Sequence, residues 1–137
     1  MNLRKYPSNC HTHCRLDDGQ GSLESYVVQA IKNGFTSLGF SCHTPLNSQK
    51  DEWRLQTADF PVYINEISRL KHDYGSEIEI YAGLEMDYLD DTDQLAGSEF
   101  AEFLDFSIAS VHCMYHRPSG AYLTVDGPVE EFEILLR

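Results

Sequence analysis

Hydrophobic residues along this chain follow two spacings in turn, one typical of strands and one typical of helices. The first helical stretch carries apolar side chains three or four positions apart: Leu23, Tyr26, Val27, Ala30 and Ile31. Ser22 can cap the start of this stretch and Gly34 can end it, which predicts an amphipathic helix between them. A second helix is expected over residues 61–75, because Pro61 suits a first turn and apolar residues again share one face.

Short apolar segments, which read as strands, separate these helices. Residues 36–42, 78–84 and 106–111 resemble buried parallel strands, and another strand is expected near the N-terminus. A weaker helical pattern covers residues 93–103, and residues 128–136 predict a further helix. Strands and helices that alternate in this order favour an α/β fold with a parallel sheet, either open or part of a barrel.

The length of the chain decides between a whole barrel and a part. The chain has 137 residues, whereas a complete eight-stranded β/α barrel takes about 200 residues or more. We therefore expect a single domain over residues 1–137 that forms about half of a barrel, with helices flanking its strands. Because an isolated half exposes the edges of its sheet, we expect a homo-oligomer or association with a missing C-terminal half.

Composition and charge limit the partners of the chain. Its net charge of −12 repels a phosphate backbone unless bound cations reverse the local field, so nucleic acid is not an expected partner. No apolar run approaches the roughly 18 residues of a membrane helix. Met1 to Ser8 are polar, unlike a signal peptide. We expect no membrane partner and a cytoplasmic location.

Metal-binding residue types follow the predicted strands: His11, His13, His43, Glu85 and His112. Because the carboxyl ends of parallel strands meet at one edge of a sheet, we expect these side chains to converge. His11 and His13 are two positions apart on an extended backbone and can present both imidazoles to one ion. Glu85, after a buried strand, needs a charge partner or a cation to compensate its burial, and two or more metal ions would satisfy it best. The sequence therefore predicts a cluster of two or more metal ions.

Further acidic residues lie near these positions. Asp17 and Asp18 follow the His-x-His pair, and we expect only one of them to point inward as a ligand. The acidic run at residues 87–93 lacks the glycine and terminal glutamate of an EF-hand loop, which favours a solvated loop over a calcium site.

Each cysteine adjoins one of the candidate histidines: Cys10, Cys14, Cys42 and Cys113. Without an export signal, thiols are expected rather than disulfides. One interpretation is a structural zinc module with mixed cysteine and histidine ligands. The other, favoured because neighbours on a strand point to opposite faces, is that the cysteines are small buried hydrophobes.

Four motifs in order resemble the polymerase and histidinol phosphatase (PHP) family, most closely its histidinol-phosphatase branch. They are CHTH from Cys10 followed by Asp18-Gly19, GFSCHTP from Gly39, GLEMDY from Gly83 and SVH from Ser110. The resemblance implies a distorted seven-stranded β/α barrel that holds two or three divalent ions, commonly zinc, manganese or iron. It also implies hydrolysis of small phosphomonoesters such as L-histidinol phosphate, in histidine biosynthesis.

The resemblance assigns roles to the predicted ligands. His11 and His13 would bind one ion, and Glu85 would bridge it to a second ion that His112 also holds. Glu85 and His112 are therefore the expected catalytic residues. The family adds ligands in its second half, including an Asp-x-His motif, and no such motif follows His112. The chain thus resembles the N-terminal part of a longer barrel.

Asp18 and His43 would share the third ion, because Asp18, like the carboxylate of the family motif, precedes a glycine. Arg15 and Arg117 lie on predicted loops and are candidate contacts for the substrate phosphate. His116 is a candidate for the leaving group.

Three hypotheses follow from these observations. The first is a phosphatase in which the ions lower the pKa of bound water towards about 7 and neutralise the phosphate oxygens. The second is a truncated half-domain that binds metal without turnover. The third is the structural zinc module built on the cysteines.

Overall fold

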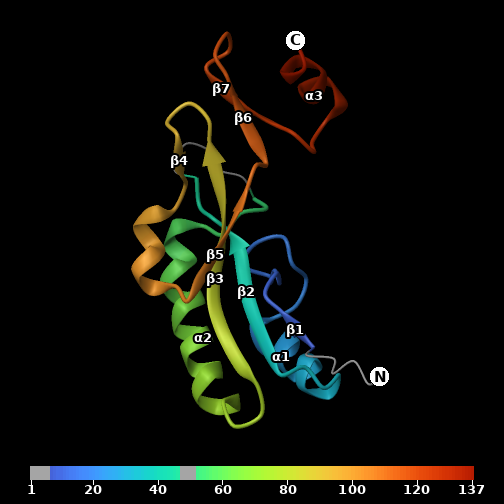
Figure 1. Cartoon of the computed structure of the whole chain (residues 1–137), viewed down its shortest axis with the longest axis vertical. Coiled ribbons are helices and arrows are strands. Elements are labelled where there is room, and N and C mark those ends of the chain that lie inside the picture. Colours follow the sequence, from blue (N-terminus) through green and yellow to red (C-terminus); the bar gives the residue numbers. More distant parts are fainter. Residues whose placement is uncertain (1–6, 47–51) are drawn as a thin grey trace, which may run out of the picture.

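The computed structural model describes residues 7–46 and 52–137, so most of the polar N-terminal segment discussed above lies outside the described residues. Its centre is a curled sheet of parallel strands with helices packed beside it (Figure 1). The parallel strands, in spatial order, are β1 (Ser8–Asn9), β2 (Ser37–His43), β3 (Glu79–Leu89) and β5 (Phe106–Ser110). This α/β half-barrel confirms the predicted fold class.

Two helices pack against one face of the sheet and form the core with it (Figure 1). Helix α1 (Leu23–Lys32) begins as predicted, because the Ser22 hydroxyl accepts a hydrogen bond from the Ser25 backbone N–H at 3.1 Å. It ends at Lys32, and Gly34, two residues later, has a φ of 76°, which suits a residue without a Cβ. Helix α2 (Phe60–Tyr74) follows a short 3₁₀ turn, η1 (Thr57–Asp59).

The two faces of the sheet carry different side chains, because successive residues of a strand point to opposite sides. The face under the helices is apolar and buried: Leu38, Phe40, Cys42, Ile80, Ala82, Leu84 and Met86. The other face carries small and polar residues, including Gly39, Gly83 and Glu85. The Phe106 ring lies so close to this face that a Cβ on Gly39 would be 2.8 Å from it. Gly39 and Gly83 thus leave room for the Phe106 ring on this face.

Strand β3 is longer than predicted. It continues to Leu89, because its residues 83–87 pair with β5 and its end pairs antiparallel with β4 (Gln94–Leu95). Glu85 therefore lies within the strand and not at its end. Asp87, which was expected to begin a solvated loop, is buried in this strand.

The helix predicted over residues 93–103 does not form. β4 occupies its first part and a 3₁₀ helix, η2 (Ser98–Phe103), its second. Gly97 separates the two with a φ of 82°, outside the range of a right-handed helix. The acidic tip at Asp90, Asp91 and Asp93 is exposed, as expected for a loop.

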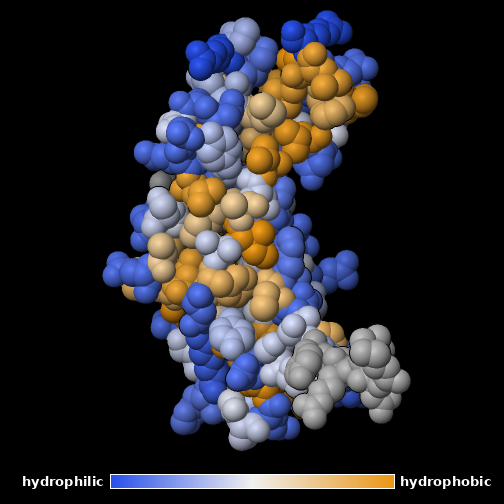
Figure 2. All heavy atoms as spheres, in the orientation of Figure 1, coloured by the Kyte–Doolittle hydropathy of each residue, from blue (hydrophilic) through white to orange (hydrophobic). Residues whose placement is uncertain are grey.

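The C-terminal part contains a hairpin that the sequence pattern did not predict. Its strands β6 (Cys113–His116) and β7 (Ala121–Thr124) pair antiparallel and lead to α3 (Val129–Leu135), a helix that was predicted. Hydrophobic side chains gather on the surface over α3 (Figure 2). Among the described residues, no helix is long and apolar enough to cross a membrane.

Helix α2 offers a matched test of the core. Leu70 is fully buried, whereas Val62 on the same helix is 56% exposed. Leu70→Ala should lower the free energy of unfolding by about 2–5 kcal/mol, because it leaves a cavity between α2 and the sheet. Val62→Ala should change it by less than about 0.5 kcal/mol. Urea denaturation followed by circular dichroism measures both, and equal effects would contradict this core.

Candidate metal centre

The structure brings the predicted ligands to one end of the parallel strands. They are His11, His13, Asp18, His43, Glu85 and His112. They form three overlapping groups, and within each group the candidate ligand atoms lie within 4.8 Å of one another. The convergence follows from parallel strands, whose carboxyl ends share one edge.

Glu85 lies at the centre of this cluster and faces histidines on both sides. Its Oε2 is 2.9 Å from His11 Nε2 and 3.2 Å from His13 Nε2. Its Oε1 is 3.3 Å from His112 Nε2 and accepts a hydrogen bond from Ser110 Oγ at 2.6 Å. Burial raises the pKa of Glu85, but hydrogen bonds from Ser110 and His11 bring it below its usual range. The carboxylate is therefore ionised at neutral pH, with one oxygen available to each side.

Asp17 holds His13 in a defined orientation. Its buried carboxylate is 2.7 Å from His13 Nδ1 and accepts hydrogen bonds from the backbone N–H groups of Cys14 at 2.9 Å and His43 at 3.1 Å. The hydrogen bond to Asp17 raises the pKa of His13. Burial raises the pKa of Asp17, but the hydrogen bonds from His13 and the backbone lower it overall. His13 Nε2 is left facing Glu85, as in histidine ligands oriented by a carboxylate.

Asp18 points towards the histidines from the exposed side of the cluster. Its Oδ1 is 3.3 Å from His13 Nδ1, and its Oδ2 is 3.5 Å from His43 Nε2. The oxygens of Asp17 are occupied by backbone donors, whereas those of Asp18 face only imidazoles in the contacts described here. This geometry is compatible with Asp18 as the ligand, which stays a prediction.

The donor set fits divalent cations. His43 is buried, and its Nδ1 has no hydrogen-bond partner in the described part of the chain. Burial and the neighbouring His13 lower the pKa of His43, which favours the neutral imidazole that binds metals. His43 Nδ1 is 3.5 Å from Glu85 Oε2 but makes no hydrogen bond, and a buried polar atom without one is costly unless a cation binds.

Asp87 was missed as a member of the site. It accepts hydrogen bonds from the backbone N–H of His112 at 2.9 Å and from His112 Nδ1 at 3.0 Å. Nε2 of the His112 ring therefore faces Glu85. The signal was present in the sequence, because Glu85 and Asp87 are two positions apart and share a face of an extended strand. The sequence prediction ended this strand at residue 84 and therefore did not place Asp87 on it.

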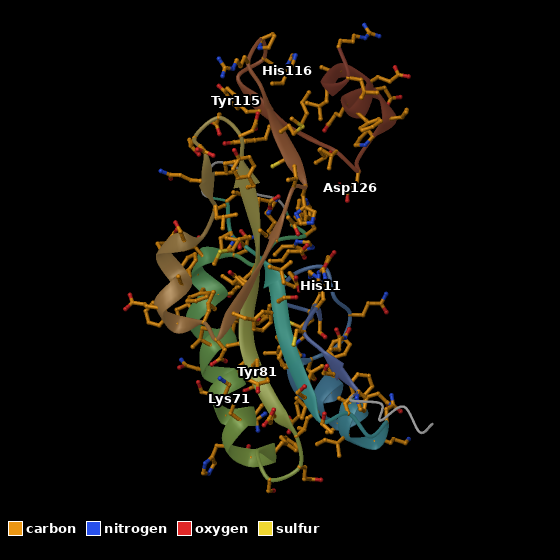
Figure 3. The ribbon with its side chains drawn as sticks, in the orientation of Figure 1. His11, Lys71, Tyr81, Tyr115, His116 and Asp126 are labelled. Atoms are coloured by element: carbon orange, nitrogen blue, oxygen red, sulfur yellow. The ribbon has the colours of Figure 1, made fainter. Side chains whose placement is uncertain are left out.

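The structure places the three predicted substrate contacts on two other surfaces. Arg15 lines a pocket of about 550 Å³ against α2, together with Glu66 and Arg69. His116 and Arg117 lie at the turn of the β6–β7 hairpin, where His116 Nδ1 is 2.8 Å from Ser119 Oγ. Figure 3 shows His116 near the opposite end of the molecule from the N-terminal strand, well away from His11.

The cysteines do not form one site. All four are thiols and not disulfides, as predicted, and Cys14 and Cys42 lie together, with their sulfurs 3.4 Å apart. Cys10 is exposed, and Cys113 is buried in a separate apolar cluster. Within the described residues, this arrangement favours buried thiols over a module with four zinc ligands.

The curled parallel sheet forms about half of a β/α barrel. Histidines and carboxylates gather at the carboxyl ends of its strands. The chain belongs to the PHP domain family, whose model matches residues 8–134. This membership confirms the resemblance in the sequence motifs.

Named relatives are histidinol phosphatases. The histidinol-phosphatase of Bacillus subtilis is 33% identical over 144 residues, which cover 98% of this chain and 53% of the relative. The histidinol-phosphatase of Lactococcus lactis is 30% identical over 115 residues, covering 80% of this chain and 40% of the relative. The chain thus spans about half the length, or less, of these curated relatives.

Solved structures share the fold. The hisK protein of Listeria monocytogenes matches with a TM-score of 0.73 and 22% identity, over 92% of this chain and 52% of that one. Histidinol phosphate phosphatase of Lactococcus lactis, complexed with zinc, L-histidinol and phosphate, matches with a TM-score of 0.59 and 23% identity. This second match covers 78% of this chain and 40% of the other.

Metal content tests the position of Glu85. Glu85→Gln should lower the number of ions retained per chain, because the variant loses the carboxylate charge between the histidines. Glu79→Gln is the matched control, since Glu79 is an exposed glutamate of the same strand. Elemental analysis after dialysis against zinc and then buffer measures both. Equal metal content in the two variants would contradict a ligand role for Glu85.

Proposed function

We propose that this chain binds divalent metal ions through the clustered histidines and carboxylates and serves the hydrolysis of a small phosphate monoester, L-histidinol phosphate. Membership of the PHP domain family and the names of the relatives support this reaction. A relative of the same fold whose structure contains zinc, L-histidinol and phosphate supports both the metal and the substrate class.

The position of Glu85 carries the proposal. One of its oxygens faces His11 and His13, and the other faces His112. A carboxylate between two sets of imidazoles suits a ligand shared by two ions. We infer that His11 and His13 hold one ion, that His112 holds the second, and that Glu85 bridges them.

A third ion is proposed between Asp18 and His43, whose candidate ligand atoms are 3.5 Å apart. Zinc, manganese and iron all suit imidazole and carboxylate ligands. Zinc has the additional support of the Lactococcus lactis relative.

The chain itself contributes positioning and charge. Asp17 and Asp87 each hold the Nδ1 side of a histidine, and Ser110 donates to Glu85, so the candidate ligand atoms point inward. When bound, the ions would neutralise the phosphate oxygens and activate water at neutral pH. This local positive charge would offset the net charge of −12, which otherwise repels an anionic substrate.

The proposed substrate contacts are expected to contribute less to catalysis than Glu85. Arg15 and Arg117 are proposed to bind phosphate and His116 to assist the leaving group, as arginine and histidine commonly do. Arg117 and His116 lie on the hairpin away from the cluster, so they contribute only when the hairpin approaches it. We therefore rank them below Glu85 in importance.

A second candidate is a metal-binding half-domain without turnover of its own. The observation that favours it is coverage, since the chain matches about half of its relatives' length. Association with a second copy, or with a chain that supplies the other half of a barrel, would complete such a site. The strand edges favour association, because β5 pairs only with β3 in the described residues.

Activity separates the two candidates. Purified chain with zinc or manganese should release phosphate from L-histidinol phosphate, and a chelator should abolish the release. Glu85→Gln should reduce kcat/KM by about 100-fold or more, because it removes a shared ligand, and Arg117→Ala should cost less. Phosphate-release kinetics measure both. Metal binding without any turnover would support the half-domain, whereas a larger loss in Arg117→Ala would contradict the bridging role.

The open sheet edge predicts the oligomeric state. We expect light scattering to give a mass of at least twice 15.6 kDa at micromolar concentration, because an uncovered strand edge favours pairing. Ala109→Lys places a charge on the exposed face of β5 and should shift the protein towards the monomer. A wild-type chain that is strictly monomeric and well folded would contradict the prediction.

A further inference from the structure

A short segment before η1 packs directly on the metal-binding residues. Its Trp53 ring lies edge-on to His43, with ring centroids 4.7 Å apart, and to His112, at 5.8 Å. The Arg54 guanidinium stacks on that indole, with Cζ 3.9 Å from the ring centroid. These two residues were not among the candidates drawn from the sequence.

Arg54 is a buried cation that is linked to His112 through Asp87. It is only 2% exposed, donates to the backbone carbonyl of Thr44 at 3.3 Å and forms an ion pair with the fully buried Asp87. Asp87 in turn accepts from both the backbone N–H and Nδ1 of His112. An unbroken chain of polar contacts therefore runs from Arg54 through Asp87 to a candidate metal ligand.

Stability alone does not account for this arrangement. Removing an arginine and an aspartate from water costs several kcal/mol per ion, and their attraction repays this cost only when the geometry is favourable. Orientation of His112 is the more specific consequence. Both ring nitrogens face a carboxylate, which can only accept, but Nδ1 makes the shorter contact: it is 3.0 Å from Asp87 Oδ1 with hydrogen-bond geometry, whereas Nε2 is 3.3 Å from Glu85 Oε1. The contact with Asp87 therefore favours the proton of the neutral ring on Nδ1 and leaves Nε2 towards Glu85.

We propose that Arg54 is a positioning residue for the metal centre. It fixes Asp87, and thereby the ring orientation and tautomer of His112, while its stacking holds Trp53 against the His43 and His112 rings. The assignment of His112 as a metal ligand rests on the function proposed above. The orientation of its ring by Arg54 does not, so the two can be tested separately.

The first experiment uses the metal-free protein. Nitrogen-15 NMR of the histidine side chains at pH 8 should show His112 in the Nδ1–H tautomer in the wild type. Arg54→Met should mix the tautomers, because Asp87 loses the partner that holds it. Arg69→Met is the control, since Arg69 is an exposed arginine of α2 paired with Glu24, Glu66 and Asp73. A pure Nδ1–H tautomer in all three proteins would overturn the proposal.

The second experiment titrates cobalt into the same proteins. Trp53 is the chain's single tryptophan, so quenching of its emission reports an ion near His43 and His112. Arg54→Met should weaken cobalt binding by about 10-fold to 100-fold, as for other residues that orient a ligand. Arg54→Lys should recover part of this loss, and Arg69→Met should bind like the wild type.

Each outcome has a separate meaning. Unchanged cobalt affinity in Arg54→Met, with normal binding by the wild type, would overturn the proposal for Arg54. Absence of cobalt binding by the wild type would instead overturn the proposed metal function, and the tautomer measurement would still decide the role of Arg54. Should Arg54→Met not fold, the double variant Arg54→Met with Asp87→Asn leaves no unpaired charge. It should fold and show a mixed tautomer and weaker binding, because the whole Arg54–Asp87 pair is lost, and wild-type values in it would overturn the proposal. Arg54→Lys, which keeps the buried charge, then tests Arg54 itself by the same two measurements, and values equal to the wild type in both would also overturn the proposal.

Discussion

The ionised carboxylate of Glu85, buried among histidines, is the constraint on which the site depends. A buried charge is tolerated only with compensating partners, and here the partners come from segments before α1, at the end of β2 and after β5. The parallel register sets this arrangement, since His43 lies directly opposite Glu85 in the β2–β3 pairing. The fold thus converts residues distant in sequence into neighbours around one negative charge.

One face of the sheet contributes to stability, and the other carries the candidate site. Apolar side chains on one face pack under α1 and α2 and supply the hydrophobic core. The opposite face carries glycines beneath the Phe106 ring and polar groups near the strand ends. Behind the candidate ligands, Asp17 and Asp87 each fix one imidazole. Although Asp17 lies in a turn and Asp87 in β3, both accept from Nδ1 of a histidine and so set the direction of its Nε2.

Much of the fold and of the candidate cluster could be predicted from the sequence, because both depend on local patterns. Helix α1 has a capping serine and a terminal glycine, and the candidate ligands follow apolar runs. Features set by tertiary contacts could not be predicted. β3 extends through Asp87 because β5 and β4 pair with it. Arg54 can be buried because it forms an ion pair with Asp87. The hairpin depends on pairing between strands of four residues each, which leaves little periodicity.

Anomalous X-ray diffraction from zinc-soaked crystals of this chain tests the central claim most directly. The account predicts two peaks flanking the Glu85 carboxylate, one within bonding distance of His11 and His13 and the other of His112, at about 2.0–2.2 Å from their nitrogen and oxygen ligands. A strong peak at Cys14 and Cys42 with none beside Glu85, or no peak at all in a folded crystal, would contradict it.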